Sequence, residues 1–222
     1  MLVPITLIVT SSFFNVSIDL KYKFVGIENF ARIFQDEKFL QSLKNSIYFV
    51  GGSLAGHCIF GLLLAIALTK NVKFREFYRA VALIPWFLCD IMIGVCFIIL
   101  FTQFGTVNAV LYNLFKTRVN WLLSPKWAIW IVTLANIWKA TSLYMCVDSS
   151  GIASIPKEIL ESAELDGAVS FKKYRYVLLP LIKPFIILTV IISAVGTFNY
   201  FGLILVMTRG GPLGSTTVPS FY

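Results

Sequence analysis

The residues best suited to chemistry are the charged side chains of a polar segment between two long apolar runs. Glu158, Glu161, Glu164 and Asp166 lie close together, and the basic, aromatic run FKKYRY follows at 171–176. Such charges suit strong hydrogen bonds and ion pairs with another protein. A helix buried in lipid has no use for them, because charges are costly there. The segment therefore predicts a membrane protein that binds a soluble partner protein.

No pattern for catalysis or metal binding accompanies these acids. The phosphate-binding pattern GxxxxGK[ST] is absent from the sequence, so nucleotide hydrolysis would have to come from a partner. The single histidine, His57, lies in an apolar run without a serine and acid set, and we interpret it as a packing residue. The cysteines also fall in apolar runs, where they behave as small hydrophobes: Cys58, Cys89, Cys96 and Cys146. We predict no catalytic residue and no metal site.

Two ionisable residues lie inside apolar runs. Asp90 and Lys139 would each cost about 2.5–3.5 kcal/mol at membrane depth on insertion scales. One interpretation is that each faces a partner helix or a watery cavity. The other is that Lys139 extends to a lipid headgroup and Asp90 lies near the interface. The sequence favours neither.

The composition is that of a membrane protein. Of 222 residues, 58% are hydrophobic and 14% are charged, whereas charged residues make up about 25% of a usual soluble domain. The mean hydropathy is +0.81. The net charge of +8 does not indicate nucleic-acid binding, because the basic residues lie mostly in short runs between apolar stretches, where they would anchor loops at lipid headgroups.

Five apolar runs are compared with the roughly 20 residues that a helix needs to cross about 30 Å of hydrocarbon. They predict an all-α integral membrane protein with spans at 1–18, 46–69, 80–104, 127–147 and 177–207. The first run is marginal in length and lacks a basic flank, so we interpret it as the tail of a longer helix and not as a signal peptide. In the second run, Gly52 and Gly56 lie four residues apart, as do Gly61 and Ala65, which predicts close approach of another helix.

The polar connections predict interfacial segments and an orientation. Residues 19–45 contain apolar positions at helical spacing, which favour one or two short helices at the interface, and 105–126 suits the same place. Apart from Lys139, nine basic residues fall on each side of the membrane if the polar segment is cytoplasmic and Lys183 is counted with it. Four of them crowd into 70–79, which favours a cytoplasmic location for that loop and for the polar segment.

The polar segment itself predicts a helix-turn-helix. Ser154 and Pro156 favour a helix start, and Glu158 places a carboxylate in the first turn, where the helix dipole is positive. The helix is predicted over 155–166 and ends at Gly167, since glycine readily adopts the left-handed conformation. A second short helix then returns to the membrane. On spacing alone, an ordinary surface helix is an equal alternative.

This segment resembles the EAA loop of binding-protein-dependent ABC transporter permeases, the type I importer family. In that family the loop, residues 155–180 here, sits in a cytoplasmic cleft of the ATP-binding subunit and couples its motion to the membrane helices. The resemblance implies that Glu161 makes a polar contact with the ATPase and that Gly167 permits the turn. Ser162 departs from the middle alanine of the motif, and Tyr174 stands where members often have phenylalanine. The matching residues are Glu161, Ser162, Ala163, Asp166, Gly167, Ala168, Leu179 and Pro180.

Three other segments extend the resemblance over nearly all of the chain. FVGIENF at 24–30, LIPW at 83–86 and GGP at 210–212 are similar to segments of the carbohydrate branch, which includes maltose and glycerol-phosphate permeases of the first-subunit type. Members of that branch have a six-helix core. The resemblance therefore implies a single type I importer transmembrane domain over 1–222, truncated at both ends, with the first span incomplete and the final span missing.

The resemblance also implies the partners. The chain would be a multi-pass subunit in the cell membrane of a prokaryote, neither an enzyme nor a cofactor-binding protein, and a separate ATP-binding cassette subunit would use ATP and Mg²⁺. A second permease and an extracytoplasmic solute-binding protein would complete the importer. Amide and aromatic groups suit the hydroxyls and faces of a sugar. The candidates for the substrate pathway are Asn136, Lys139, Asn199 and Tyr200.

Two alternatives remain open. A permease for a polyamine, phosphate or an amino acid would share the loop and differ in the cavity. A secondary transporter or a structural membrane subunit would use no ATPase and would leave the glycine-terminated acidic helix unexplained.

Overall fold

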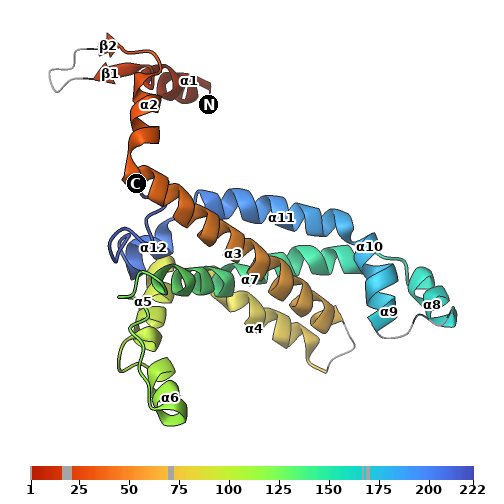
Figure 1. The fold of residues 1–222 in the computed structure, drawn as a ribbon. Coiled ribbons are helices and arrows are strands. Elements are labelled where there is room, and N and C mark those ends of the chain that lie inside the picture. The colour runs from red at the N-terminus through yellow and green to blue at the C-terminus, as the bar shows by residue number, and fades with distance from the viewer. Residues whose placement is uncertain (1, 17–21, 70–72, 167, 169–170) are drawn as a thin grey trace.

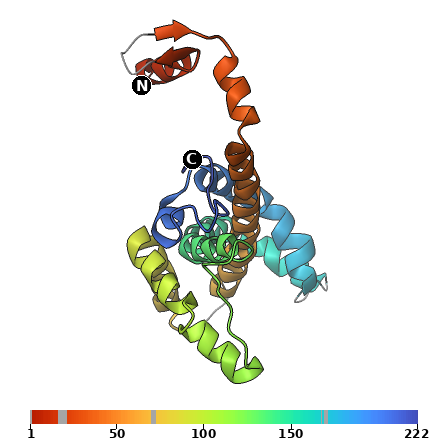
Figure 2. The ribbon, with the colours of Figure 1, turned by 60° about the vertical axis from the view of Figure 1, so that its left-hand side comes forward.

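The described part of the chain is mostly helical, as its composition predicts. The computed structural model describes residues 2–16, 22–69, 73–166, 168 and 171–222, and Figures 1 and 2 show them from two directions. A central bundle is joined at one end to the helix-turn-helix of the polar segment. A small N-terminal unit projects from the other end of the bundle in both views.

Four helices form the bundle. They are α3 (Glu37–Thr69), α4 (Arg75–Phe87), α7 (Ala128–Ala153) and α11 (Lys183–Phe198). Helix α7 is central, because it contacts α3, α4 and α11. Its position explains why polar side chains such as Asn136 and Asp148 are almost fully buried in it.

Close packing of α3 against α7 depends on small residues. A β-carbon at position 56 would lie 2.4 Å from Cδ1 of Ile137, and one at position 61 would lie 2.9 Å from Cβ of Tyr144. Ala65, one turn further along α3, is fully buried. The predicted close approach of a helix to this face is therefore confirmed, and its partner is α7.

The span predicted at 80–104 is not one continuous helix. Helix α4 ends at Phe87, and α5 (Asp90–Phe101) begins after Leu88 and Cys89, whose backbones are extended. Pro85 in the last turn of α4 cannot donate a backbone hydrogen bond, which favours this break. After α5 the chain continues as α6 (Thr106–Phe115) within the segment expected at the interface.

The C-terminal part of the predicted span 177–207 is also divided. Helix α11 ends at Phe198, and α12 (Gly202–Met207) follows after a short turn. Before α11, the chain bends by 62° between residues 174–181 and 183–198, at the prolines that interrupt the predicted start. The two broken segments meet at one end of α7, where α5 and α12 contact each other and α7 (Figure 1).

Length and composition identify two segments of the described chain that could each cross a membrane, α3 and Asp90–Phe115. The bent pair at 174–198 would make a third. Helix α7 covers the predicted span 127–147 as a single helix, but its interior position requires fewer apolar residues than a lipid-facing helix does.

The N-terminal unit differs from its prediction. Helix α1 (Leu2–Ser11) is shorter than the expected span, of which residues 1 and 17–18 lie outside the described residues. It is followed by an antiparallel hairpin of β1 (Phe14–Val16) and β2 (Tyr22–Phe24), which the apolar pattern did not predict. The hydroxyl of Ser11 donates to the carbonyl of Ile8, and such local bonds compete with helix continuation.

Of the one or two short helices predicted before the second span, one forms as α2 (Glu28–Gln35). The second does not form separately, because Phe39, Leu40 and Leu43 belong to the first turns of α3. Asp36 separates α2 from α3, and its carboxylate accepts a hydrogen bond of 2.8 Å from the backbone N–H of Lys38. This contact caps the start of α3.

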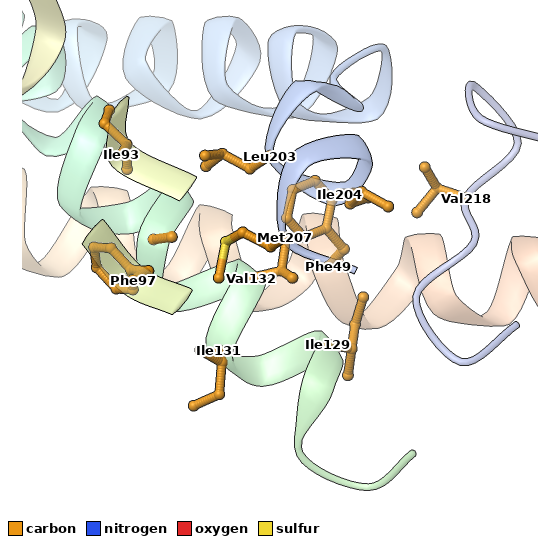
Figure 3. Close-up of a cluster of buried hydrophobic side chains, with 11 residues drawn as sticks. Phe49, Ile93, Phe97, Ile129, Ile131, Val132, Leu203, Ile204, Met207 and Val218 are labelled. Atoms are coloured by element: carbon orange, nitrogen blue, oxygen red, sulfur yellow. The ribbon is translucent and has the colours of Figure 1, made fainter. Parts of the chain in front are cut away.

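Two apolar clusters hold the broken segments to the bundle. Figure 3 shows the first, in which Ile93 and Phe97 of α5 and Leu203 and Met207 of α12 surround Val132 of α7. The second lies at the other end of the bundle and joins residues of α3 and α7 to the polar segment through Leu178 and Ile182. Both ends of α7 are therefore fixed by side-chain packing.

The glycine contact between α3 and α7 gives a first prediction. Gly56→Ala should destabilise the protein by about 1–3 kcal/mol, because its methyl group would overlap the stiff, β-branched side chain of Ile137. The measurement is thermal unfolding in detergent. Gly51→Ala is the matched control on the same helix, since a β-carbon there meets nothing within 4 Å. Equal unfolding midpoints for the two variants would contradict the packing argument.

Candidate functional site

The polar segment forms a helix-turn-helix at the end of the bundle where α4 begins (Figure 1). Its first arm is α8 (Lys157–Leu165). The second arm runs through α9 (Phe171–Lys173), the π-helical turn η1 (Tyr174–Leu178) and α10 (Leu179–Leu181). Helix α8 is shorter than the predicted 155–166, because α7 continues to Ala153 and Pro156 has the extended ψ of 137° that precedes a helix.

The first arm ends in a tight hydrogen-bonded turn. The N–H of Ala168 donates to the carbonyl of Ala163 over 2.9 Å, and the N–H of Asp166 donates to the carbonyl of Ser162 over 3.0 Å. A bond that spans six residues in this way is typical of a Schellman motif at a helix end. Gly167, the predicted turn residue, lies outside the described residues.

The two arms are joined to each other and to the bundle. Nζ of Lys173 lies 2.6 Å from Oε1 of Glu164, which links the second arm to the first. Ala163 is buried, and Leu179 packs against the apolar cluster that includes Leu178. Pro180 is exposed. The loop is therefore anchored on α3 and α7, so a force on it would reach the bundle.

The outer face of α8 is free of other parts of the described chain. Glu161, Ser162 and Asp166 are exposed, and the side chain of Leu165 is 91% exposed. Sequence reasoning did not single out Leu165, because a leucine between acids fits the inner face of a helix equally well. The sequence feature that indicates its exposure is its position outside the apolar stripe of Ile155, Ile159 and Ala163.

A cavity of about 330 Å³ lies beside the middle of α7, whereas the loop follows the C-terminal end of that helix. Its walls come from the end of α4, the middle of α7, and the end of α11 with the turn that follows. The lining residues are Trp86, Asn136, Lys139, Ala140, Tyr144, Gly196, Thr197 and Tyr200. Such a volume and mixture of aromatic and polar groups are typical of a small-molecule site.

Three of the four pathway candidates meet at this cavity. Asn136, Lys139 and Tyr200 line it, whereas Asn199 is exposed and donates to the carbonyl of Val195 over 3.0 Å at the end of α11. Sequence reasoning missed Thr197 and also Trp86, which lies at the end of α4. The signal for Trp86 was its place just after Pro85, where a helix is expected to break.

An ion pair crosses the cavity wall. Nζ of Lys139 pairs with the carboxylate of Asp90, and the hydroxyl of Tyr200 donates to the same carboxylate oxygen. The side chains of Asp90 and Lys139 are only 28% and 17% exposed. Of the two interpretations left open by the sequence, the structure supports the one in which these residues face a partner helix and a cavity.

A second polar cluster lies between α3, α7 and α11 and shares Asn136 with the cavity lining. Nδ2 of Asn136 donates to the hydroxyl of Ser53 over 2.9 Å. His57 is fully buried, and its ring nitrogens lie 2.8 Å from the hydroxyl of Ser193 and 3.3 Å from the carbonyl of Asn136. Both ring nitrogens have partners, so His57 is the packing residue that the sequence predicted. Among the described residues, no group of His, Cys, Asp and Glu side chains could hold a metal ion.

Broken helices around a polar cavity, together with an exposed helix-turn-helix, define a transport protein of the permease class. Residues 58–221 match the family of the binding-protein-dependent transport system inner membrane component, and the chain belongs to that family. It is therefore a multi-pass membrane protein and a transport subunit, not an enzyme.

Two relatives are permease proteins of sugar transport systems. The trehalose/maltose transport system permease protein MalF of Thermococcus litoralis is 32% identical over 195 residues, which cover 87% of this chain and 66% of that protein. The sulfoquinovosyl glycerol transport system permease protein SmoG of Agrobacterium fabrum is 32% identical over 222 residues, 99% of this chain and 72% of that protein. The chain thus spans about two thirds of the length of these relatives.

Solved structures share the fold. A chain of a bacterial alginate ABC transporter in complex with an alginate pentasaccharide-bound periplasmic protein superposes with a TM-score of 0.75 at 26% identity, over 86% of this chain and 67% of that one. A bacterial ABC transporter involved in the import of alginate gives a TM-score of 0.80 at 24% identity, over 98% and 76%. The predicted type I importer fold is confirmed.

The ion pair gives a second prediction. Lys139→Met should lower stability by about 3 kcal/mol, because it leaves the Asp90 carboxylate partly buried without its cation. Adding Asp90→Asn should recover most of that loss, since the double variant buries no charge. The measurement is a double-mutant cycle of unfolding in detergent. Additive losses in the double variant would show that the pair contributes nothing.

Proposed function

We propose that the chain is the membrane-spanning permease subunit of an ATP-driven, binding-protein-dependent sugar importer. The observation that carries the proposal is the direct connection between the exposed helix-turn-helix and the polar cavity. Helix α7 contains Asn136 and Lys139 and leads into α8 after Ala153. Helix α11 follows the second arm and ends at the cavity with Thr197.

This connection suits the transmission of a rigid-body movement. From Lys139 to the end of α7 at Ala153, a helical rise of 1.5 Å per residue gives about 21 Å. The glycine-packed contact with α3 keeps that distance rigid. A displacement of the loop therefore moves the cavity wall by a similar amount, which is the requirement for alternating access.

The proposed partner at the loop is an ATP-binding cassette subunit, which would use ATP and Mg²⁺. The exposed acids of α8 and the apolar side chain of Leu165 supply a mixed surface of the kind that protein interfaces use. The EAA-loop residues Glu161, Ser162, Ala163, Asp166, Gly167, Ala168, Leu179 and Pro180 would form or support this surface. A second permease subunit and an extracytoplasmic solute-binding protein would complete the importer, in the cell membrane of a prokaryote.

Sugar is the proposed substrate because several relatives bear the names of sugar transport systems, for trehalose/maltose, sulfoquinovosyl glycerol and lactose. The lining of the cavity fits that class, since Trp86, Tyr144 and Tyr200 offer aromatic faces and Asn136 and Thr197 offer polar atoms. A permease for a polyamine, phosphate or an amino acid is the second candidate. Binding assays of these solutes on the purified transporter separate the two.

Coupling through the loop gives a third prediction. In the complete transporter, Glu161→Ala and Gly167→Val should each lower sugar-stimulated ATPase activity and uptake by roughly tenfold, since they remove a polar contact and obstruct the turn. Glu76→Ala is the matched control, because Glu76 is an exposed acid in the first turn of α4, the helix that begins at the same end of the bundle. Full activity in the Gly167→Val variant would rule out the coupling role.

The exposed leucine gives a fourth prediction. Leu165→Asp should weaken co-purification of the ATPase by about 2 kcal/mol, or roughly 30-fold in affinity, as expected for an apolar anchor in an interface. The permease itself should remain folded, because this side chain contributes little to its own core. Leu213→Asp is the control, since Leu213 is 95% exposed and follows α12 at the opposite end of the bundle. Equal ATPase recovery in both variants would exclude Leu165 from the interface.

A further inference from the structure

The charge of the cavity is the property that the family resemblance leaves undecided. Relatives at similar identity are named for transport of uncharged sugars, such as trehalose/maltose, and of charged solutes, such as sn-glycerol-3-phosphate. Alginate, which a transporter of the same fold imports, is an acidic polysaccharide. Any choice between these classes must come from the side chains of this chain.

One formal charge lines the cavity, and it has a partner. Among the lining residues of the described chain, Lys139 is the only one with a charged side chain at neutral pH. Its ammonium group pairs with the carboxylate of Asp90 just behind the wall. The one acid of α7, Asp148, lies more than two turns further along that helix and accepts a hydrogen bond from Thr189 over 3.1 Å. This side of the cavity is therefore electrically balanced.

The pair is held in place from four elements. Asp90 occupies the first position of α5, where the helix dipole favours a carboxylate, and the Tyr200 hydroxyl donates to it from the turn before α12. Nζ of Lys139, on α7, lies 5.5 Å from the centroid of the Tyr200 ring. Gly202 at the start of α12 leaves room for the carboxylate, because a β-carbon there would lie 1.9 Å from Oδ2 of Asp90.

Such a fixed pair has a consequence for binding. A solute anion that approached Lys139 would meet the Asp90 carboxylate as well, and it would lose hydration without gaining an unpaired cation. A hydroxyl group has no such penalty, since it can accept from the ammonium and donate to the neutral polar groups around it. Aromatic walls from Trp86 and Tyr144 then bind the apolar faces of the ring.

We propose that the Asp90–Lys139 pair makes this cavity selective for uncharged, polyhydroxylated solutes, with Asp90 as the residue that determines specificity against anions. The inference rests on the proposed function and names the substrate class of the same site. It separates this chain from relatives whose names refer to anionic cargo. Asp90 acts through Lys139, by cancelling the charge that would otherwise attract an anion.

The test uses the complete transporter, purified in detergent without its binding protein, and three matched probes. These are methyl maltoside and its two analogues in which the terminal C6 hydroxymethyl group is replaced by a carboxylate or by an aminomethyl group. Equilibrium dissociation constants are measured by calorimetry for the native protein, Asp90→Asn, Lys139→Gln and the double variant. The net charge at positions 90 and 139 is zero in the native protein, plus one in Asp90→Asn, minus one in Lys139→Gln and zero in the double variant.

The native protein should bind methyl maltoside at least roughly tenfold more tightly than the carboxylate analogue. Asp90→Asn should shift this ratio by roughly tenfold or more toward the carboxylate, and Lys139→Gln should shift it toward the ammonium analogue. The double variant should again bind methyl maltoside most tightly. A merely structural role of the pair would not produce opposite shifts in the single variants and their reversal in the double variant. Where one single variant fails to assemble, the other still decides, because each must shift the ratio in its own direction relative to the native protein.

Two results would overturn the inference alone while methyl maltoside still binds. One is a native preference for the carboxylate analogue, and the other is an unchanged ratio in an assembled Asp90→Asn transporter. Absence of binding of all three probes to the assembled native transporter would overturn the sugar function as well. Failure of the charge argument is thus distinct from failure of the proposed function.

Discussion

The close contact between α3 and α7 is the constraint on which the other parts of the structure depend. In lipid there is little hydrophobic gain when two helices meet, so their association relies on tight packing and on buried polar contacts. Gly56 and Gly61 allow that packing, and Ser53 and His57 add hydrogen bonds along the same interface. Because α7 is fixed in this way, it can hold the cavity residues in its middle and the helix-turn-helix at its end.

Breaks in the neighbouring helices give the cavity its polar wall. The α4–α5 and α11–α12 breaks bring Asp90 and Tyr200 to Lys139, and the resulting bonds satisfy a carboxylate and an ammonium group that lipid would not tolerate. Apolar packing of α5 and α12 against Val132 supports the arrangement from behind (Figure 3). Unbroken α7 and α3 form the frame against which these broken segments pack. The proposed alternating access would need such a frame beside segments that move.

Sequence patterns predicted the continuous elements better than the interruptions. The glycine spacing of α3 and the acidic helix that ends before Gly167 depend on residues close together in the chain, so their signals are local. The hairpin of β1 and β2 pairs neighbouring residues, but each strand has only 3 residues, too few for an alternating apolar pattern to predict it. Pro85 alone does not show that α4 must end at Phe87. The first turns of α3 are also held by distant residues, since Asn45 donates to the carbonyl of Gly214. Hydropathy averages over such features. It also could not distinguish a lipid-facing helix from α7, whose polar residues are tolerated because other helices surround it.

The sequence by itself determined that this is a membrane protein, that it is helical and to which family it belongs. Composition, the lengths of the apolar runs and the order of the EAA-loop residues are properties of the chain alone. It also determined that the loop would be polar and end in a turn. Only the tertiary structure decided the partners of the isolated charges. Asp90, Lys139 and Tyr200 are separated by 49 and 61 residues along the chain, and no periodicity links them. Their meeting follows from how two broken helices pack against α7, and that packing makes one cavity wall electrically neutral.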